Sequence, residues 1–133
     1  MKNLHSCFFT LLAGFMFFTA CTPDDDISGD PRDKFIGSWL CRDSSKTTGD
    51  VRTYSISITK EGEFDEVSIN NFYDLGSSNP SRGVVSGTSI VVPNQTVDGF
   101  VLNGSGVYND GEFFIEYSSK LGSDTDLGIA EYQ

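Results

Sequence analysis

The side chains in this sequence that could carry out acid–base chemistry are carboxylates. A glycosidase, for example, needs two carboxyl groups about 5 to 10 Å apart. Residues at alternate positions share one face of an extended strand, and three acidic pairs fit such a spacing: Glu63 with Asp65, Glu112 with Glu116, and Asp124 with Asp126. All three pairs lie in or beside expected turns of a very acidic chain, where solvated surface is the ordinary role of such groups. We therefore predict no catalytic residue among them.

The first 20 residues predict a secretory signal. Met1, Lys2 and His5 form a basic start, and an apolar run from Cys7 to Ala20 follows. This run is 14 residues long, whereas a helix that crosses about 30 Å of hydrocarbon needs about 20 residues. The run is therefore too short to remain as a transmembrane helix. The alternatives to a lipoprotein signal are an ordinary signal peptide with an incidental cysteine, or a short buried helix.

The residues that end this signal are Phe18-Thr19-Ala20-Cys21, which resemble the lipobox of bacterial lipoproteins. The resemblance implies cleavage before the cysteine, transfer of a diacylglyceryl group to its thiol, and acylation of the new amine. A thiolate is the strongest side-chain nucleophile near neutral pH, and small preceding residues let a peptidase approach the backbone. Because more than one lipid chain makes anchoring stable, we expect a mature protein that is anchored through Cys21 without a transmembrane helix.

Loss of this signal would remove the only histidine of the chain, His5. Without histidine there is no Ser-His-Asp triad, no Cys-His pair and no His-containing metal site. Cys41 would be the only free thiol, and since it shares a strand face with Trp39 we interpret it as a small core residue. Asp124 and Asp126 lack the regularly spaced oxygen ligands of an EF-hand calcium loop. We expect no enzymatic activity, no metal and no cofactor.

Residues 21–32 predict a flexible tether, because they are acidic and contain two prolines and one aliphatic side chain. The run Asp24-Asp25-Asp26 resembles the signal by which some Gram-negative bacteria export lipoproteins to the outer face of the outer membrane. This resemblance implies a lipid-anchored protein of the bacterial outer membrane that faces the cell surface. The alternative is a merely soluble spacer on a lipoprotein that faces the periplasm.

The mature chain would be strongly acidic. It holds eight Lys and Arg against 19 Asp and Glu, because the first 20 residues contain only one charged side chain, Lys2. The eight basic residues are scattered from Arg32 to Lys120 and form no cluster. Binding to nucleic acid or to anionic lipid headgroups needs such a cluster. We expect no nucleic-acid partner and a membrane contact made by the N-terminal lipid.

Residues 33–133 predict one all-β domain. The clearest strand is 52–60, where Tyr54, Ile56 and Ile58 alternate with polar side chains, as in a half-buried strand. Seven further segments have strand character and are separated by Gly, Asn, Asp, Ser and Pro. They are 35–42, 64–72, 83–86, 89–93, 99–108, 112–118 and 127–132.

Short connections predict how these strands pair. Asn109-Asp110-Gly111 tolerates the positive φ values of a tight hairpin turn, and Gly87 marks a second hairpin. Gly104-Ser105-Gly106 predicts a bend or bulge inside a strand rather than a phosphate-binding loop. An even number of strands with nearest-neighbour connections favours an antiparallel up-and-down β-barrel.

The segment Asp33-Lys34-Phe35-Ile36-Gly37-Ser38-Trp39-Leu40 resembles the first strand of the calycins, the lipocalin and fatty-acid-binding barrels. The succession of segments up to Ala130-Glu131-Tyr132 is similar to small uncharacterised lipocalin-like lipoprotein domains. The resemblance covers residues 33–133 and implies that Trp39 plugs one end of the barrel, with Gly37 as a close-contact glycine. The chain differs from typical lipocalins because it is shorter and lacks their long C-terminal helix.

Two non-catalytic functions follow from a tethered barrel. In the first, the barrel binds a small apolar or amphipathic ligand. The candidate ligand-lining or core residues are Trp39, Tyr54, Ile56, Ile58, Phe113 and Ile115. In the second, the interior is filled by side chains, and the outer face or the loops, especially residues 73–82, contact another protein or a glycan at the cell surface. A third interpretation, an enzyme that uses only carboxylates and tyrosines, has no supporting motif.

Overall fold

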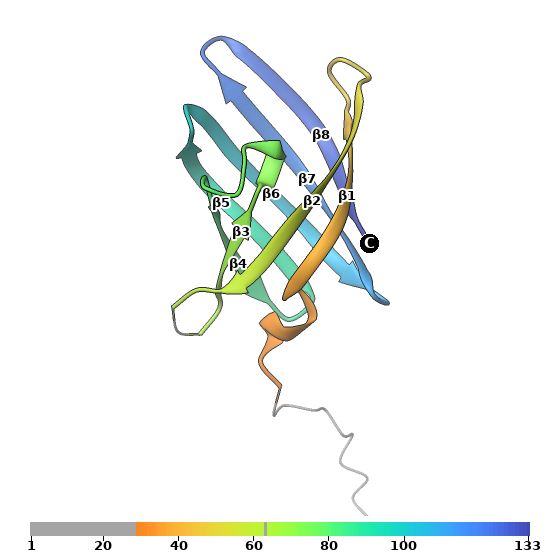
Figure 1. Cartoon of the computed structure of the whole chain (residues 1–133), viewed down its shortest axis with the longest axis vertical. Coiled ribbons are helices and arrows are strands. Elements are labelled where there is room, and N and C mark those ends of the chain that lie inside the picture. Colours follow the sequence, from red (N-terminus) through yellow and green to blue (C-terminus); the bar gives the residue numbers. More distant parts are fainter. Residues whose placement is uncertain (1–28, 63) are drawn as a thin grey trace, which may run out of the picture.

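The computed structural model describes residues 29–62 and 64–133. It is a closed barrel of eight antiparallel strands, in which each strand pairs with its sequence neighbours and β1 pairs with β8 (Figure 1). The predicted all-β up-and-down barrel is confirmed. The predicted signal peptide 1–20, Cys21 and the run 24–26 lie outside the described residues. The strands are β1 (Gly37–Ser45), β2 (Val51–Lys60), β3 (Glu66–Asn70), β4 (Ser81–Ser86), β5 (Ser89–Val97), β6 (Phe100–Asn109), β7 (Glu112–Leu121) and β8 (Asp124–Tyr132), with two short 3-10 helices, η1 (Pro31–Lys34) and η2 (Phe72–Asp74).

Both predicted hairpin turns are present. Asp110 and Gly111 have φ values of 50° and 86° between β6 and β7, as a primed turn requires. Gly87, at φ 58°, turns the chain from β4 into β5. The local turn chemistry therefore sets these two strand pairings.

Strand β3 is shorter than predicted. It begins at Glu66 instead of Phe64, because Gly62 and Phe64 both have positive φ, 57° and 72°, and hold the chain in a turn. The Phe64 side chain is 82% exposed and is not part of the core. The prediction of strand 64–72 also fails at its end, where Asn71 leaves the sheet at φ 68°.

Strand β5 continues to Val97, beyond the predicted end at residue 93, and contains a bulge. Val92 is in register with Gly104 and Gln95 with Leu102, so Pro93 and Asn94 together face one residue of β6. A proline lacks the N–H for the ladder and is tolerated where pairing is interrupted. Of the bend or bulge predicted at 104–106, a bulge is absent from the pairing of β6 with β7, which keeps an unbroken register there; the irregularity lies on β5 instead.

The interior of the barrel holds one hydrophobic core built from alternate residues of the strands. Near one end, three aromatic rings pack around Phe113, whose ring centroid lies 4.8 Å from that of Trp39 and 4.3 Å from that of Tyr132. Phe35, fully buried, completes the group at 5.3 Å from Phe113. Large aromatic rings bury about 150–250 Å² each and so dominate the stability of a core this size.

Helix η1 lies across this end, which we call the closed end (Figure 1). The Trp39 indole N–H donates to the Phe35 carbonyl at 2.8 Å, and the Arg32 guanidinium donates to the Glu66 carbonyl at 3.1 Å. Arg32 also forms an ion pair with Asp30 at 2.7 Å, which fixes the point where the chain enters the barrel. Gly37 has φ 130° and no atom within 4 Å of a Cβ placed on it, so its backbone angle and not the predicted close contact calls for glycine.

Candidate binding site at the open end of the barrel

The other end of the barrel contains a hollow of about 490 Å³, which we call the mouth. Four connections surround it, namely residues 46–50, 71–80, 98–99 and 122–123, so its walls come from segments far apart in the sequence (Figure 1). The wall residues used below are Thr47, Tyr73, Phe100, Leu121, Asp124 and Asp126. The mouth therefore combines aromatic, aliphatic and carboxylate side chains in one concave site, as ligand sites commonly do.

An unusual backbone conformation places Tyr73 in the mouth. Tyr73 has φ 56° and Asn71 has φ 68°, and a left-handed conformation is uncommon for a bulky residue such as tyrosine. The Asn71 amide donates to the Ser55 carbonyl at 2.8 Å and accepts from the Gly76 N–H at 2.7 Å. Because Phe72 is also buried in the core, the loop is held on both sides. Such strain, on the order of 1–3 kcal/mol, persists only where the surroundings fix it.

The hydroxyl of Tyr73 donates to the Asp126 carboxylate at 2.7 Å, and the Ser45 hydroxyl donates to the other oxygen of the same group. Burial, together with the hydrogen bond to Asp126, raises the pKa of Tyr73. The hydroxyl thus stays protonated and keeps donating. Asp126 has no ion-pair partner within residues 29–62 and 64–133, so its negative charge is not neutralised at the mouth.

A buried charged cluster lies next to the mouth; it consists of Asp43, Arg52, Tyr54 and Tyr117. The Asp43 side chain is inaccessible to solvent and accepts from Arg52 at 2.6 Å, from Tyr117 at 2.6 Å and from Tyr54 at 3.2 Å. A buried carboxylate needs such partners, because removing a charge from water is costly. The Arg52 guanidinium also lies 4.6 Å from the centre of the Tyr73 ring, which connects this Asp43 cluster to the mouth.

Burial raises the pKa of several groups inside the barrel. It raises the pKa of the Cys41 thiol to about 11, and also raises the pKa of the Tyr54, Tyr117 and Tyr132 hydroxyls. In the unfolded chain these groups titrate near 8.5 for Cys and 10 for Tyr. The folded state therefore keeps protons that the unfolded state has already released.

We predict that the free energy of unfolding falls as the pH rises from about 8.5 to 11, because the state with more bound protons is disfavoured at alkaline pH. Urea titrations at a series of pH values measure this slope. Cys41→Ala should remove the earliest part of the loss and leave the tyrosine part. Stability that stays constant up to pH 11 would contradict the prediction.

The six predicted ligand-lining or core residues all lie inside the barrel and none lies in the mouth. Ile56, Ile58, Phe113 and Ile115 are buried in the core, while Trp39 and Tyr54 are half-buried beside it. Of the predicted carboxylate pairs, Asp124 and Asp126 line the mouth, Glu112 and Glu116 are exposed on β7, Asp65 is in the β2–β3 turn, and Glu63 lies outside the described residues. Within the predicted contact loop 73–82, Tyr73 lines the mouth.

Sequence reasoning did not single out Asp43, Tyr73 or Phe100 as site residues. A signal for Asp43 was present, because it follows Trp39 and Cys41 at alternate positions and therefore points into the barrel. A carboxylate in that register needs partners, which predicts a buried cluster. No comparable local signal exists for Tyr73, whose position depends on the conformation of its loop.

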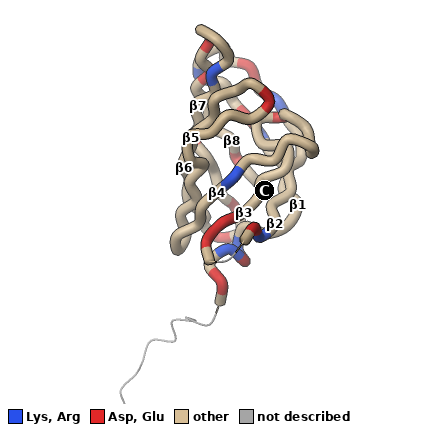
Figure 2. Tube along the Cα trace, turned by 90° about the vertical axis from the view of Figure 1, so that its left-hand side faces the viewer, with Lys and Arg blue, Asp and Glu red and all other residues tan. Residues whose placement is uncertain are grey.

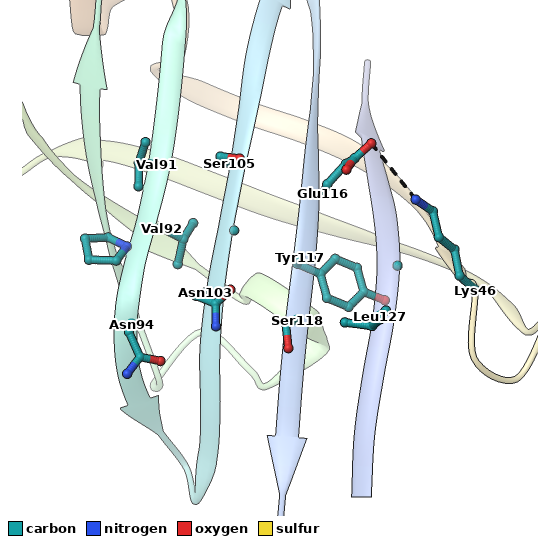
Figure 3. A pocket seen from close by; sticks show the side chains of 13 residues that line it. Lys46, Val91, Val92, Asn94, Asn103, Ser105, Glu116, Tyr117, Ser118 and Leu127 are labelled. Atoms are coloured by element: carbon teal, nitrogen blue, oxygen red, sulfur yellow. Dashed lines mark ion pairs between the residues drawn. The ribbon is translucent and has the colours of Figure 1, made fainter.

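A second hollow, of about 520 Å³, lies on the outer face of β5 to β8, and we call it the outer hollow (Figure 3). Val91 and Leu127 lie at its two sides, while Asn103, Ser105 and Ser118 cover the strands between them. An ion pair of 4.0 Å between Lys46 and Glu116 bounds it on the β8 side (Figure 3). This surface is polar and uncharged at its centre, unlike the mouth.

Comparisons of the chain with known protein families, curated proteins and solved structures found no match. Within residues 29–62 and 64–133, no helix has the length and apolar character needed to cross a membrane. The same residues contain no group of three or more His, Cys, Asp or Glu side chains that could hold a metal ion.

Proposed function

We propose that this protein is a lipid-anchored lipoprotein of the bacterial outer membrane, whose non-catalytic barrel binds a small amphipathic ligand at the mouth. The observation that supports this proposal most directly is the mouth itself, in which Tyr73 and Phe100 stand beside the carboxylate of Asp126. Apolar walls with a few fixed polar groups are typical of small-molecule sites. The resemblance of residues 33–40 to the first strand of the calycins also favours a binding role.

The position of the tether indicates how the mouth would be oriented relative to the membrane. The chain enters the barrel at the closed end, beside η1, and the mouth lies at the opposite end (Figure 1). A lipid at Cys21 would hold the closed end toward the bilayer. The mouth would then face away from the membrane and be accessible to ligands in the surrounding medium.

The anchor predicts a change in localisation. Cys21→Ser removes the thiol that receives lipid, so we expect the protein to leave the membrane fraction and appear in soluble or secreted form. Fractionation followed by immunoblotting measures the distribution. Cys41→Ser is the matched control, because its thiol lies in the core, and it should stay with the membrane. Unchanged membrane retention of Cys21→Ser would refute the anchor.

Ligand binding is tested by native mass spectrometry of the protein purified from its own source. A co-purifying small molecule that is lost when Phe100 is replaced by serine would support the mouth as the site. A clean apo mass for both proteins would contradict it. Because the mass of a bound molecule is read directly, this experiment does not depend on any assumption about the charge of the ligand.

The outer face supports a second candidate function, contact with another surface protein or a glycan. Val107 and Phe114 are cross-strand partners, point outward, and are each 41% exposed. They lie on β6 and β7, which also form the outer hollow. A partner captured by cross-linking to the wild-type barrel, and lost with Phe114→Ser but kept with Phe100→Ser, would select this function over the first.

A further inference from the structure

The charge of the mouth indicates which class of amphipathic ligand it accepts, and this inference rests on the proposed function. The four connections around the mouth contain one basic residue, Lys46, and three acidic residues, Asp50, Asp74 and Asp98. Asp124 and Asp126, near the start of β8, add two carboxylates to the wall of the mouth. Figure 2 shows acidic positions in the connections at both ends of the barrel. An acidic rim raises the local concentration of cations and disfavours anions.

No basic side chain among the described residues forms an ion pair with Asp124 or Asp126. Lys46 forms its ion pair with Glu116 on the outer face at 4.0 Å, and Arg52 forms its ion pair with buried Asp43 at 2.6 Å. Among the described residues, the hydrogen bonds to Asp126 come from two neutral hydroxyls, those of Ser45 and Tyr73. A half-buried carboxylate in this setting gains most from a positively charged partner.

The aromatic side chains of the mouth are also suited to a cation. The Arg52 guanidinium lies 4.6 Å from the centre of the Tyr73 ring, so this ring already takes part in one cation–π contact. The Phe100 ring lies 5.6 Å from that of Tyr73 and extends the aromatic wall. Leu121 lies on the same wall and would contact an apolar chain.

We propose that the mouth binds an amphipathic organic cation, with a substituted ammonium head near Asp126 and the Tyr73 and Phe100 rings, and a short apolar chain against Leu121. A polyol or sugar would use the same hydroxyl and carboxylate groups without needing the net charge. Neutral and anionic compounds with the same alkyl chain therefore form the decisive comparison.

The experiment uses the full chain carrying Cys21→Ser and three octyl probes below their micelle concentrations: octyltrimethylammonium, octyl glucoside and octyl sulfate. Calorimetry measures affinity, and amide chemical shifts locate the probe. We expect binding of octyltrimethylammonium, with shifts at Thr47, Tyr73, Phe100 and Asp126. Affinity should fall as salt rises from 10 mM to 500 mM. Equal or tighter binding of octyl glucoside or octyl sulfate, or no binding of the cation, would overturn the inference.

Three variants separate the local carboxylate from the overall charge of the protein. Asp126→Asn should weaken binding about tenfold, as the loss of one hydrogen-bonded charge contact predicts. Asp124→Asn, an exposed position on the same wall, should weaken it about threefold without affecting the core. Glu116→Gln, which removes one charge at the outer hollow, should leave it within twofold. Equal effects of all three substitutions would contradict a site at Asp126.

The two proposals fail in different ways. A neutral or anionic molecule that co-purifies and is lost with Phe100→Ser would leave the binding function intact and refute the cation. If Asp126→Asn loses its structure, seen as a collapsed amide spectrum, the inference is tested by the affinity of Asp124→Asn and by the salt dependence of binding. If neither of these lowers the affinity, the inference is wrong.

Discussion

Replacing Asp43 by alanine should lower the free energy of unfolding by about 3 kcal/mol. The substitution removes an acceptor shared by three donors, the Arg52 guanidinium and the Tyr54 and Tyr117 hydroxyls. Breaking a buried ion pair from one side costs about 3–5 kcal/mol because the remaining groups stay desolvated. The Arg52 side chain is 40% exposed, so part of its charge can be solvated, and the lower value is expected. Urea unfolding at neutral pH measures the difference.

An exposed ion pair provides the control for this experiment. Arg42 and Glu131 lie 3.4 Å apart, and more than half of each side chain is accessible to solvent. Glu131→Ala should cost no more than about 0.5 kcal/mol, as is usual for surface pairs. Asp43→Asn, which keeps the shape and one acceptor oxygen, should fall between the two. If Asp43→Ala destabilises the protein no more than Glu131→Ala does, the Asp43 cluster does not have the stabilising role described here.

Replacing Gly106 by alanine should destabilise the barrel by about 3 kcal/mol through a steric clash. A Cβ at this position would lie 1.6 Å from the carbonyl oxygen of Phe114 and 2.6 Å from its carbon. Both atoms belong to the backbone of β7, which is in register with β6 along its length. No rotamer change relieves such a contact, so the two strands must separate locally. Overpacking of a tight site costs about 1–3 kcal/mol, and sometimes more.

Two neighbouring substitutions test whether the cause is steric. Ser105→Ala changes the preceding residue, which is exposed. Its free energy of unfolding should stay within about 0.5 kcal/mol of the wild-type value. Gly111→Ala places a Cβ in open space at φ 86°, so it should cost only the strain of a left-handed alanine, about 1 kcal/mol. Thermal and urea unfolding rank the three variants. A cost for Gly106→Ala no larger than that for Gly111→Ala would show that the backbone contact is relieved by adjustment.

The barrel could be predicted because its strands and turns are specified locally. The alternation of Tyr54, Ile56 and Ile58 predicts an inward face, and Asp110-Gly111 has the φ values that a hairpin turn needs. An even number of such strands with nearest-neighbour connections favours a closed barrel, and the pairing of β1 with β8 completes it. The wrong prediction for Phe64 also has a local cause. Phe64 is hydrophobic, yet its positive φ places it in an exposed turn.

The mouth could not be predicted in the same way, because its residues come from three separate connections and from the ends of β6, β7 and β8. Tyr73 enters the site through a left-handed backbone conformation that has no sequence signature in a tyrosine. Phe100 begins β6 and Asp126 lies near the start of β8. Both approach Tyr73 only after the barrel has closed. Their chemistry is visible in the sequence, but their proximity is a property of the complete sheet.

The seam between the first and last strands has a consequence for how the chain folds. Pairing of β1 with β8 joins Cys41 to Tyr132, and the Tyr117 hydroxyl reaches Asp43 across a separation of 74 residues. These contacts require closure of nearly the whole chain, which has a high entropic cost and slows folding in all-β proteins. Until the last strand is in place, both edges remain open to pairing with other chains. Closure of this seam therefore also protects the chain against aggregation.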